Sequence, residues 1–272
     1  MTLEKTKRLL QSNKIVPNKV LGQNFLIEQS LYTKLCESAS LNKSDVILDA
    51  GAGFGLLACF LAERCKAVVA VEKDPKVVNI LRGQTKDLRN ITVIEGDVLT
   101  TSLPWFNKVI SAPPYYLSSN LITWLLQRKF DCAVLILQKE FADRLVATVG
   151  SEDYSWLTVV TNHLAEVQLF NAVPRSMFYP PPEVNSIIVR LRPRSNKLFE
   201  IKDPAFFERL VKWLFTQRNK KLSKALAPFI RDNCKLSKQE ANKLSLSLPY
   251  HDKRPREMAP IDFGAVANAL SE

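Results

Sequence analysis

Short apolar runs recur along the first half of the chain, and several are followed by glycine or an acidic residue and then by a stretch with helical spacing. Runs of this kind predict buried strands. They cover residues 45–49, 67–71, 91–94, 108–110 and 133–137. Asp49, Glu72 and Asp97 stand at or just after three of these runs, 23 and 25 residues apart, a spacing typical of successive βα units. We therefore expect an α/β fold with a Rossmann-like parallel sheet.

The pattern changes towards the C-terminus. Residues 157–162 and 166–170 fit either two strands or a helix followed by a strand, and residues 186–191 predict a last, antiparallel strand near the sheet edge. Beyond Pro193 the apolar residues adopt helical spacing, first in residues 206–215 and then in short stretches over 236–270. We expect two domains, one over residues 1–192 with a basic N-terminal arm broken by Pro17, and a small helical one over 193–272.

Charge is unevenly distributed along the 272 residues, whose net charge is +11. Residues 1–20 carry five Lys/Arg and one acid, a net charge of +4, and residues 190–272 carry eighteen Lys/Arg and nine acids, a net charge of +9. The body between them has a net charge of −2. Basic segments on both sides of a near-neutral body indicate a polyanionic partner such as nucleic acid.

Composition argues against several classes of protein. No apolar run approaches the length of a membrane span, and the first residues lack the apolar core of a signal peptide. The five cysteines are odd in number and have no CxxC spacing, and His163 and His251 have no ligand cluster nearby, so neither a disulfide framework nor a metal site is indicated. We expect a cytoplasmic protein with reduced cysteines and no membrane partner.

A glycine-rich turn and two acidic residues predict a ligand site. The turn runs from Gly51 through Gly53 to Gly55, between a strand and a helix, where backbone N–H groups can approach a ligand. Glu72 is placed to accept both hydroxyls of a ribose, although a solvated acid at a strand end is the simpler alternative. Asp97 is placed to accept from an adenine amino group. The GxGxG pattern is not the GxGxxG pattern of dinucleotide-binding oxidoreductases.

The segment after the fourth strand predicts a second part of this site. Ala112-Pro113-Pro114 stops the strand, because neither proline has an N–H, and Tyr115 and Tyr116 follow at once. A rigid turn that carries an aromatic ring at the carboxyl end of a strand can hold a flat ligand. The alternative is a Pro-Pro loop with two surface tyrosines.

Five segments together resemble one enzyme family over nearly the whole chain. They are residues 21–26 (LGQNFL), 49–55 (DAGAGFG), 178–186 (FYPPPEVNS) and the tail motifs at 215–222 and 256–270. They are similar to motifs of the KsgA-type small-subunit rRNA adenine N6,N6-dimethyltransferases, particularly the archaeal and eukaryotic members. The resemblance implies an S-adenosylmethionine (SAM)-dependent monomer that dimethylates two adjacent adenosines near the 3′ end of small-subunit rRNA, within a pre-30S or pre-40S particle.

The resemblance also implies roles for single residues. Cofactor binding would fall to Gln23, Asn24 and Leu26 closing over SAM, Gly51 and Gly53 at its methionine part, Glu72 at its ribose and Asp97 at its adenine, and also to Lys73 and Val98. Catalysis would fall to Ala112, Pro113, Pro114, Tyr115 as the stacking ring and Phe178 beside it. RNA binding would fall to Arg218, Lys220, Lys221 and Lys224.

One position departs from the family. Its motif is Asn-Leu-Pro-Tyr, whereas this chain has Ala112-Pro113-Pro114-Tyr115. In the family the Asn oxygen and a backbone carbonyl accept hydrogen bonds from the adenine amine, and Ala112 offers no side-chain acceptor. We therefore expect slow methylation. The alternatives are a ribosome-assembly factor that binds the same RNA with little methylation, and a methyltransferase of large-subunit rRNA.

Overall fold

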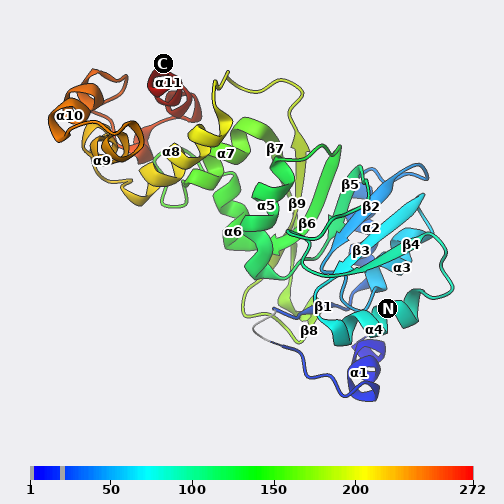
Figure 1. Cartoon of the computed structure of the whole chain (residues 1–272). Coiled ribbons are helices and arrows are strands. Elements are labelled where there is room, and N and C mark those ends of the chain that lie inside the picture. The colour runs from blue at the N-terminus through cyan, green and yellow to red at the C-terminus, as the bar shows by residue number, and fades with distance from the viewer. Residues whose placement is uncertain (1–2, 19–21, 272) are drawn as a thin grey trace. The chain divides into compact units, whose positions relative to one another are not determined.

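The computed structural model describes residues 3–18 and 22–271 (Figure 1). They form two compact units. The first comprises Met1–Ala142 and Glu166–Pro193, and the second comprises Asp143–Ala165 and Arg194–Glu272.

The first unit is built on a seven-stranded sheet with the order β4-β3-β2-β5-β6-β9-β7. Strands β2 to β6 pair in parallel, and β9 runs antiparallel to β6. The strands of this sheet are β2 (Val46–Ala50), β3 (Ala67–Glu72), β4 (Ile91–Glu95), β5 (Lys108–Ser111), β6 (Cys132–Gln138), β7 (Ala165–Val173) and β9 (Ser186–Pro193). The helices that accompany it are α1 (Leu3–Ser12), α2 (Gln29–Ser38), α3 (Leu56–Ala62), α4 (Pro75–Thr85), α5 (Ser118–Leu126) and α6 (Lys139–Leu145).

The core of this unit follows the two-residue period of the strands. Ile47, Val68, Ile110 and Val134 point to one face and pack in one cluster with residues of α2, α3 and α4, whereas their neighbours along each strand point to the other face. Both faces are apolar because the central strands are buried on both sides. The register places the carboxyl ends of β2, β3 and β4 side by side, with Ala50 opposite Val71 and Glu72 opposite Glu95.

A second, two-stranded sheet joins two segments that are far apart in sequence. Strand β1 (Phe25–Leu26) pairs antiparallel with β8 (Phe178–Tyr179), with Leu26 opposite Phe178. The Ile27 N–H donates to the Met177 carbonyl at 3.0 Å and extends the pairing. Short 3-10 helices at Tyr115–Leu117 and Arg175–Met177 complete the unit.

The second unit is helical. It contains α7 (Trp156–Leu164), α8 (Pro204–Thr216), α9 (Leu222–Cys234), α10 (Lys238–Ser247), the 3-10 helix Pro255–Glu257 and α11 (Pro260–Leu270). Helix α8 begins where the Asp203 side chain accepts from the Phe206 N–H at 2.9 Å, and it buries Phe207, Leu210 and Leu214. Such caps satisfy N–H groups that lack partners inside the helix.

The structure agrees with the predicted strands and with the helical C-terminal part. Residues 157–170 are a helix followed by a strand, which is one of the two predicted alternatives, and β9 is antiparallel and lies next to the edge strand β7. The structure differs at the N-terminus, where residues 3–12 form a helix that ends before Pro17. The division between the units also differs from a single boundary at residue 193. Asp143–Ala165 belongs to the second unit, because the buried Tyr154 hydroxyl donates to the Met258 carbonyl at 2.7 Å and the His163 ring stacks on Phe199.

Candidate functional site

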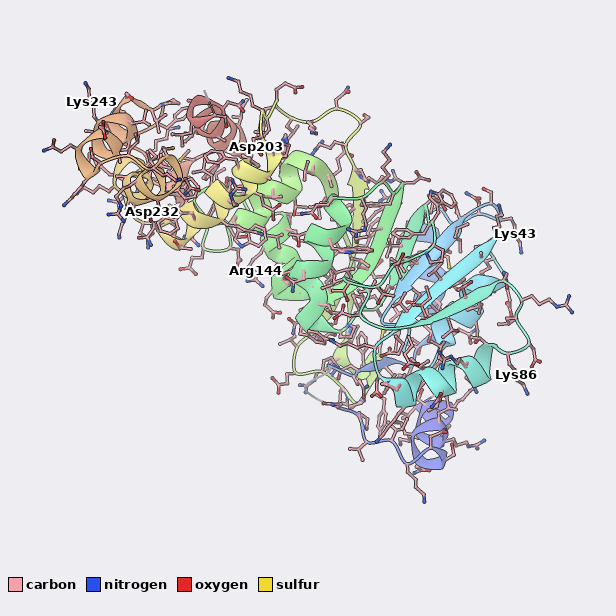
Figure 2. The ribbon with its side chains drawn as sticks, viewed as in Figure 1. Lys43, Lys86, Arg144, Asp203, Asp232 and Lys243 are labelled. Carbon is pink, nitrogen blue, oxygen red and sulfur yellow. The ribbon has the colours of Figure 1, made fainter. Side chains whose placement is uncertain are left out.

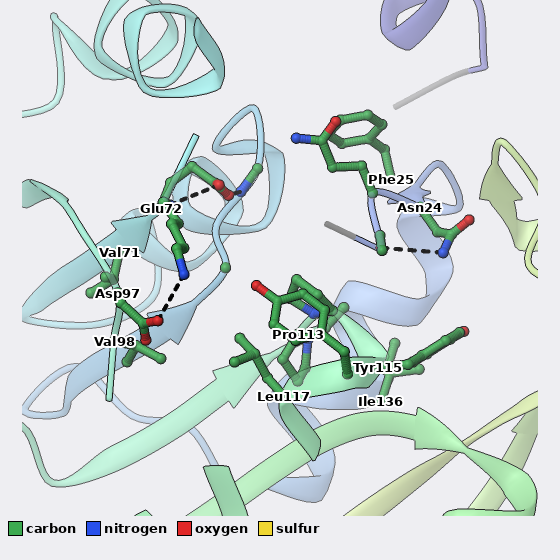
Figure 3. Close-up of a pocket in the computed structure, with 18 of the residues that line it drawn as sticks. Asn24, Phe25, Val71, Glu72, Asp97, Val98, Pro113, Tyr115, Leu117 and Ile136 are labelled. Atoms are coloured by element: carbon green, nitrogen blue, oxygen red, sulfur yellow. Dashed lines mark hydrogen bonds and ion pairs between the residues drawn. The ribbon is translucent and has the colours of Figure 1, made fainter. Parts of the chain in front are cut away.

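A pocket opens at the carboxyl edge of the sheet in the first unit (Figure 3). Its empty volume is about 760 Å³, part of which is open to solvent. All but one of the predicted cofactor-binding and catalytic residues line it. The lining residues are Gln23, Asn24, Gly51, Gly53, Glu72, Lys73, Asp97, Val98, Ala112, Pro113, Pro114, Tyr115 and Phe178. The exception is Leu26, which lines a smaller neighbouring pocket.

The floor of the pocket is the turn after β2. The N–H groups of Gly51 and Ala52 donate to the Val71 carbonyl at 2.8 and 2.9 Å, so the turn is fixed to β3. A Cβ at Gly51 would lie 2.7 Å from Pro114 Cδ, and Gly51 has a φ of +78°. Only glycine fits this conformation and this close approach. The glycine-rich turn and the Ala-Pro-Pro-Tyr segment are therefore in direct contact.

Glu72, at the end of β3, holds its carboxylate in a fixed orientation. One oxygen accepts from the Gly53 N–H at 2.9 Å, and the other accepts from the N–H groups of Lys73 and Asp74 at 2.8 and 3.0 Å. Burial raises the pKa of this carboxyl, and the three N–H donors oppose that rise. Because a carboxylate has about four lone-pair sites, it retains acceptor capacity for ribose hydroxyls.

Asp97 stands beside Glu72 at the edge of the sheet (Figure 3). The Leu99 N–H donates to one of its oxygens at 3.0 Å and is the main reason why its pKa is lowered. Its other oxygen pairs with Lys73 Nζ at 3.0 Å. Val98 is 2% exposed and lines the same wall with Val71, so a carboxylate borders an apolar surface that suits a flat base.

Asp49, at the end of β2, is a site residue that the sequence prediction did not include. It is 1% exposed, and its Oδ2 atom has no hydrogen-bond partner among the described residues. Burial raises its pKa to about 7. It lines the smaller neighbouring pocket with Asn24, Gly51 and Ala112. The acid preceding a glycine-rich turn was visible in the sequence, but its lack of a partner was not.

The Ala-Pro-Pro-Tyr segment forms the opposite wall. The Pro114 carbonyl accepts from the Leu117 N–H at 3.0 Å, whereas within the described ranges no donor reaches the Pro113 carbonyl. Tyr115 is fixed by a hydrogen bond of 2.5 Å between its hydroxyl and Ser186 Oγ, which is fully buried at the start of β9. The ring therefore has a defined position on the pocket wall, and Ala112 beside it contributes no polar side-chain atom.

The N-terminal signature encloses the pocket from a third side. The Gln23 amide donates to Asp74 at 2.9 Å and so ties this segment to the start of α4. The Asn24 amide donates to the Gly22 carbonyl at 3.2 Å. Phe25, which the prediction did not include, stacks on Phe54 with ring centroids 4.0 Å apart. Phe178 reaches the same pocket because β8 pairs with β1. Leu21 of the signature lies outside the described residues.

The four predicted RNA-binding residues lie in the second unit. Arg218 donates to the carbonyls of Glu152 and Ser151 at 2.8 and 3.0 Å, and Lys221 pairs with Asp252 at 2.8 Å. Lys220 and Lys224 are exposed. Two of the four thus have partners inside the protein, and their contact with RNA stays a prediction.

The pocket residues fit a nucleoside cofactor that carries a charged amino-acid part. Asp49 supplies a buried oxygen without a partner, Glu72 an oriented acceptor, and the Gly51–Gly53 turn a surface without side chains. No cluster of His, Cys, Asp or Glu that could hold a metal occurs among residues 3–18 and 22–271. In the same ranges no helix is both long and apolar enough to cross a membrane.

Comparison with known proteins agrees with this site. The profile of the family described as Ribosomal RNA adenine dimethylase matches residues 16–258. The "Probable ribosomal RNA small subunit methyltransferase A" proteins of Methanosarcina acetivorans and Pyrococcus abyssi are 39% and 35% identical to this chain. Those alignments cover 91% of both chains for the first, and 97% of this chain and 96% of the relative for the second.

Two solved structures are similar over most of their length. One is a dimethyladenosine transferase from Plasmodium falciparum, with a TM-score of 0.75, 27% identity, and coverage of 89% of this chain and 95% of that one. The other is the 23S rRNA methyltransferase ErmE, with a TM-score of 0.65, 28% identity, and coverage of 92% and 100%. With its profile match and its relatives above 30% identity, the chain belongs to the ribosomal RNA adenine dimethylase family.

Proposed function

We propose that this enzyme transfers methyl groups to N6 of two adjacent adenosines near the 3′ end of small-subunit rRNA. The observation that carries the proposal is the contact between the cofactor turn and the Ala-Pro-Pro-Tyr wall within one pocket, where a Cβ on Gly51 would meet Pro114. The choice of the small subunit is supported by the names of the archaeal relatives. We infer that it acts as a cytoplasmic monomer on a pre-30S or pre-40S particle.

S-adenosylmethionine is the cofactor, and it supplies an electrophilic methyl group on a sulfonium. We assign Glu72 to the ribose and Asp97 to the adenine of this cofactor, with Val98 packing on the base. Gly51 and Gly53 border its methionine part, and Gln23, Asn24 and Leu26 hold the segment that covers it. Lys73 holds Asp97 in place through their ion pair.

The residues at the target base have to make a poor nucleophile react. The adenine amine shares its lone pair with the ring, so the enzyme helps by accepting hydrogen bonds as the nitrogen becomes tetrahedral. We assign that role to the Pro113 carbonyl, with Pro114 fixing the turn. Tyr115, fixed by Ser186, stacks on the adenine, a contact worth about 1–3 kcal/mol per base, and Phe178 packs beside it.

Ala112 determines the methylation rate that we expect. One N–H of the amine lacks an acceptor, and loss of a single transition-state hydrogen bond costs about 10²–10³ in rate. The same residue favours the second candidate, an assembly factor that binds rRNA with little methylation. A large-subunit substrate is the third candidate, favoured by the likeness to ErmE. The long basic tail, with a net charge of +9 over residues 190–272, favours the small subunit.

The test is methyl transfer from labelled SAM to unmethylated small ribosomal subunits, followed by mapping of the modified adenosines. The unaltered protein should methylate slowly, and Ala112→Asn should raise the single-turnover rate by roughly two to three orders of magnitude at unchanged RNA affinity. Ala112→Val is the matched control, because it fills space without adding an acceptor, and it should give no increase.

Three outcomes distinguish the candidates. Equal rates for the unaltered protein and Ala112→Asn would contradict the acceptor role of position 112. Tight binding without transfer in either protein would favour the assembly factor. Transfer to large subunits alone would favour the third candidate.

A further inference from the structure

A basic groove lies between α9 and α10 in the second unit, away from the four predicted RNA-binding positions except Lys224. It is lined by Lys224, Ala227, Pro228, Arg231, Lys238, Ala241 and Asn242, and its empty volume is about 530 Å³ including solvent at its mouth. Three of the seven lining residues are cations and none is an acid. The small side chains of Ala227 and Ala241 keep the groove open between the cations.

The cations of the groove are free to meet a ligand. Among the described residues neither Lys224 nor Lys238 has an ion-pair partner, in contrast to Lys221, which is paired with Asp252. Arg231 pairs with Asp232 only through its Nε atom, at 2.9 Å. Its two terminal amino groups, which form the fork that binds phosphate oxygens, have no partner in the described part of the chain.

Each of the two helices carries one acid, and neither acid lines the groove. Asp232 pairs with Arg231 Nε and offsets part of its charge. Glu240, on α10, accepts from the Ser237 N–H at 2.9 Å and caps the start of that helix. The lining itself therefore carries three cations, and among the described residues Lys224 and Lys238 have no ion-pair partner.

The backbone of α9 adds an acceptor to this row of donors. Pro228 lies inside the helix and has no N–H, so the Lys224 carbonyl lacks its usual donor four residues later. Lys224, Pro228 and Arg231 are spaced by four and three residues and share one helix face. Cations with a backbone acceptor between them match a ribose-phosphate chain, whose phosphates accept and whose 2′-hydroxyl donates.

We propose that the α9–α10 groove is a binding site for the RNA backbone, with Lys224, Arg231 and Lys238 on its phosphates. The proposal rests on the proposed function, because it takes rRNA as the substrate, and it moves the principal phosphate contacts from Arg218 and Lys221 to α9 and α10. Arg218 and Lys221 instead hold the fold of the second unit through their internal partners.

The experiment replaces Lys224, Arg231 and Lys238 together by glutamine in the full-length chain and measures methyl transfer to unmethylated small subunits as a function of salt. We expect KM for the subunits to rise about tenfold to a hundredfold with kcat unchanged, since three surface charge contacts are lost. The slope of log KM against log salt should also fall by roughly two to three, at about 0.7–0.9 per phosphate. The affinity for SAM should stay the same.

Matched single variants serve as the control. Lys238→Gln and Lys243→Gln each remove one exposed cation from α10, but Lys243 does not line the groove, and its side chain extends into solvent (Figure 2). Lys238→Gln should raise KM, and Lys243→Gln should leave it near that of the unaltered protein. Equal effects of the two would overturn the groove as a site and indicate only general charge attraction.

Failure of the groove can be told from failure of the proposed function. If the unaltered protein methylates small subunits and the triple variant has the same KM and salt slope, the groove proposal is overturned and the proposed function stands. If neither the unaltered protein nor Ala112→Asn binds or methylates rRNA, the proposed function fails, and the RNA assignment of the groove fails with it. A rise in KM accompanied by loss of SAM affinity would also overturn the proposal, because it would indicate general damage.

Discussion

Two aspartates at opposite ends of β2 show how strongly the surroundings of a carboxyl determine its behaviour. Asp45 and Asp49 are 3% and 1% exposed. Asp45 Oδ2 pairs with Lys108 Nζ at 2.8 Å, and the hydrogen bonds from Lys108 and Asn107 outweigh burial, so its pKa is lowered. Asp49 has an oxygen with no hydrogen-bond partner within the described part of the chain, and burial raises its pKa to about 7. Asp45 therefore stabilises the fold in its charged form, whereas ionisation of Asp49 destabilises the folded state when no cation lies beside it.

We predict that Asp49→Asn stabilises the protein at alkaline pH when no cofactor is bound. The folded-state pKa of Asp49 lies above its ordinary value of 3.8, so the stability that it contributes is present below about pH 4 and is lost as the pH rises through about 7. Asparagine does not ionise, so the variant does not lose this stability as the pH rises. At about 1.36 kcal/mol per pKa unit, the gain at pH 8 is at most about 4 kcal/mol, and it should vanish near pH 4.

Urea unfolding at a series of pH values measures this gain. Asp45→Asn is the matched control, because Asp45 is a buried carboxyl immediately before the same strand and its pKa is lowered rather than raised. It should destabilise the protein at neutral pH, since Lys108 is left buried and unpaired. A gain for Asp49→Asn that is the same at pH 4 and pH 8 would contradict the titration of Asp49.

At the scale of elements, the pairing of β1 with β8 joins two signatures that lie about 150 residues apart in the sequence. This pairing places Phe25 against the glycine turn, where its ring lies 3.3 Å from the position that a Cβ of Gly53 would occupy. Each strand has only two residues, so the pair depends on its side-chain contacts, above all on the stack of Phe25 upon Phe54. The Phe25–Phe54 stack thus supports this wall of the cofactor pocket, together with the hydrogen bonds of Gln23 and Ile27.

Phe25→Leu should therefore weaken SAM binding while the sheet remains intact. An aromatic pair is worth about 0.5–1.5 kcal/mol beyond its buried area, which corresponds to a loss of about two- to tenfold in affinity. Calorimetric titration with SAM measures it. Phe106→Leu is the control, because Phe106 is 7% exposed where Phe25 is 8% exposed, and it stacks on Trp124 beyond the pocket lining. Equal affinities for SAM in the two variants would show that the Phe25 stack does not shape the pocket.

The sequence predicted elements better than it predicted contacts. The central strands were predictable because burial on both faces leaves uninterrupted apolar runs, and the residues at their ends followed from the βα period. Residues 157–170 were ambiguous because α7 passes directly into β7, with no turn residue between Leu164 and Ala165. The hydrogen bond between Tyr115 and Ser186 joins residues 71 apart. No local pattern encodes such a contact.

At the scale of the whole molecule, charge is distributed so that one part of the chain suits SAM and another suits rRNA. The body over residues 21–189 has a net charge of −2 and contains the cofactor pocket, whereas residues 190–272 have a net charge of +9. At the cofactor pocket the recognition groups include the buried carboxyl of Asp49 and the hydrogen-bonded carboxylate of Glu72, and buried interactions are screened little by salt. On the basic tail they are exposed cations, whose contacts with phosphates release counterions.

Salt should therefore weaken the binding of small subunits and leave the binding of SAM nearly unchanged. Each phosphate contact changes the slope of log affinity against log salt by about −0.7 to −0.9, so engagement of even four cations predicts a slope near about −3 for small subunits. Binding of SAM, measured by calorimetry at the same salt concentrations, should change by less than about twofold. A KM for small subunits that stays flat between low and high salt would contradict phosphate binding by the basic tail. Recognition would then have to rest on contacts with bases, and the excess of lysine and arginine beyond residue 190 would need another explanation.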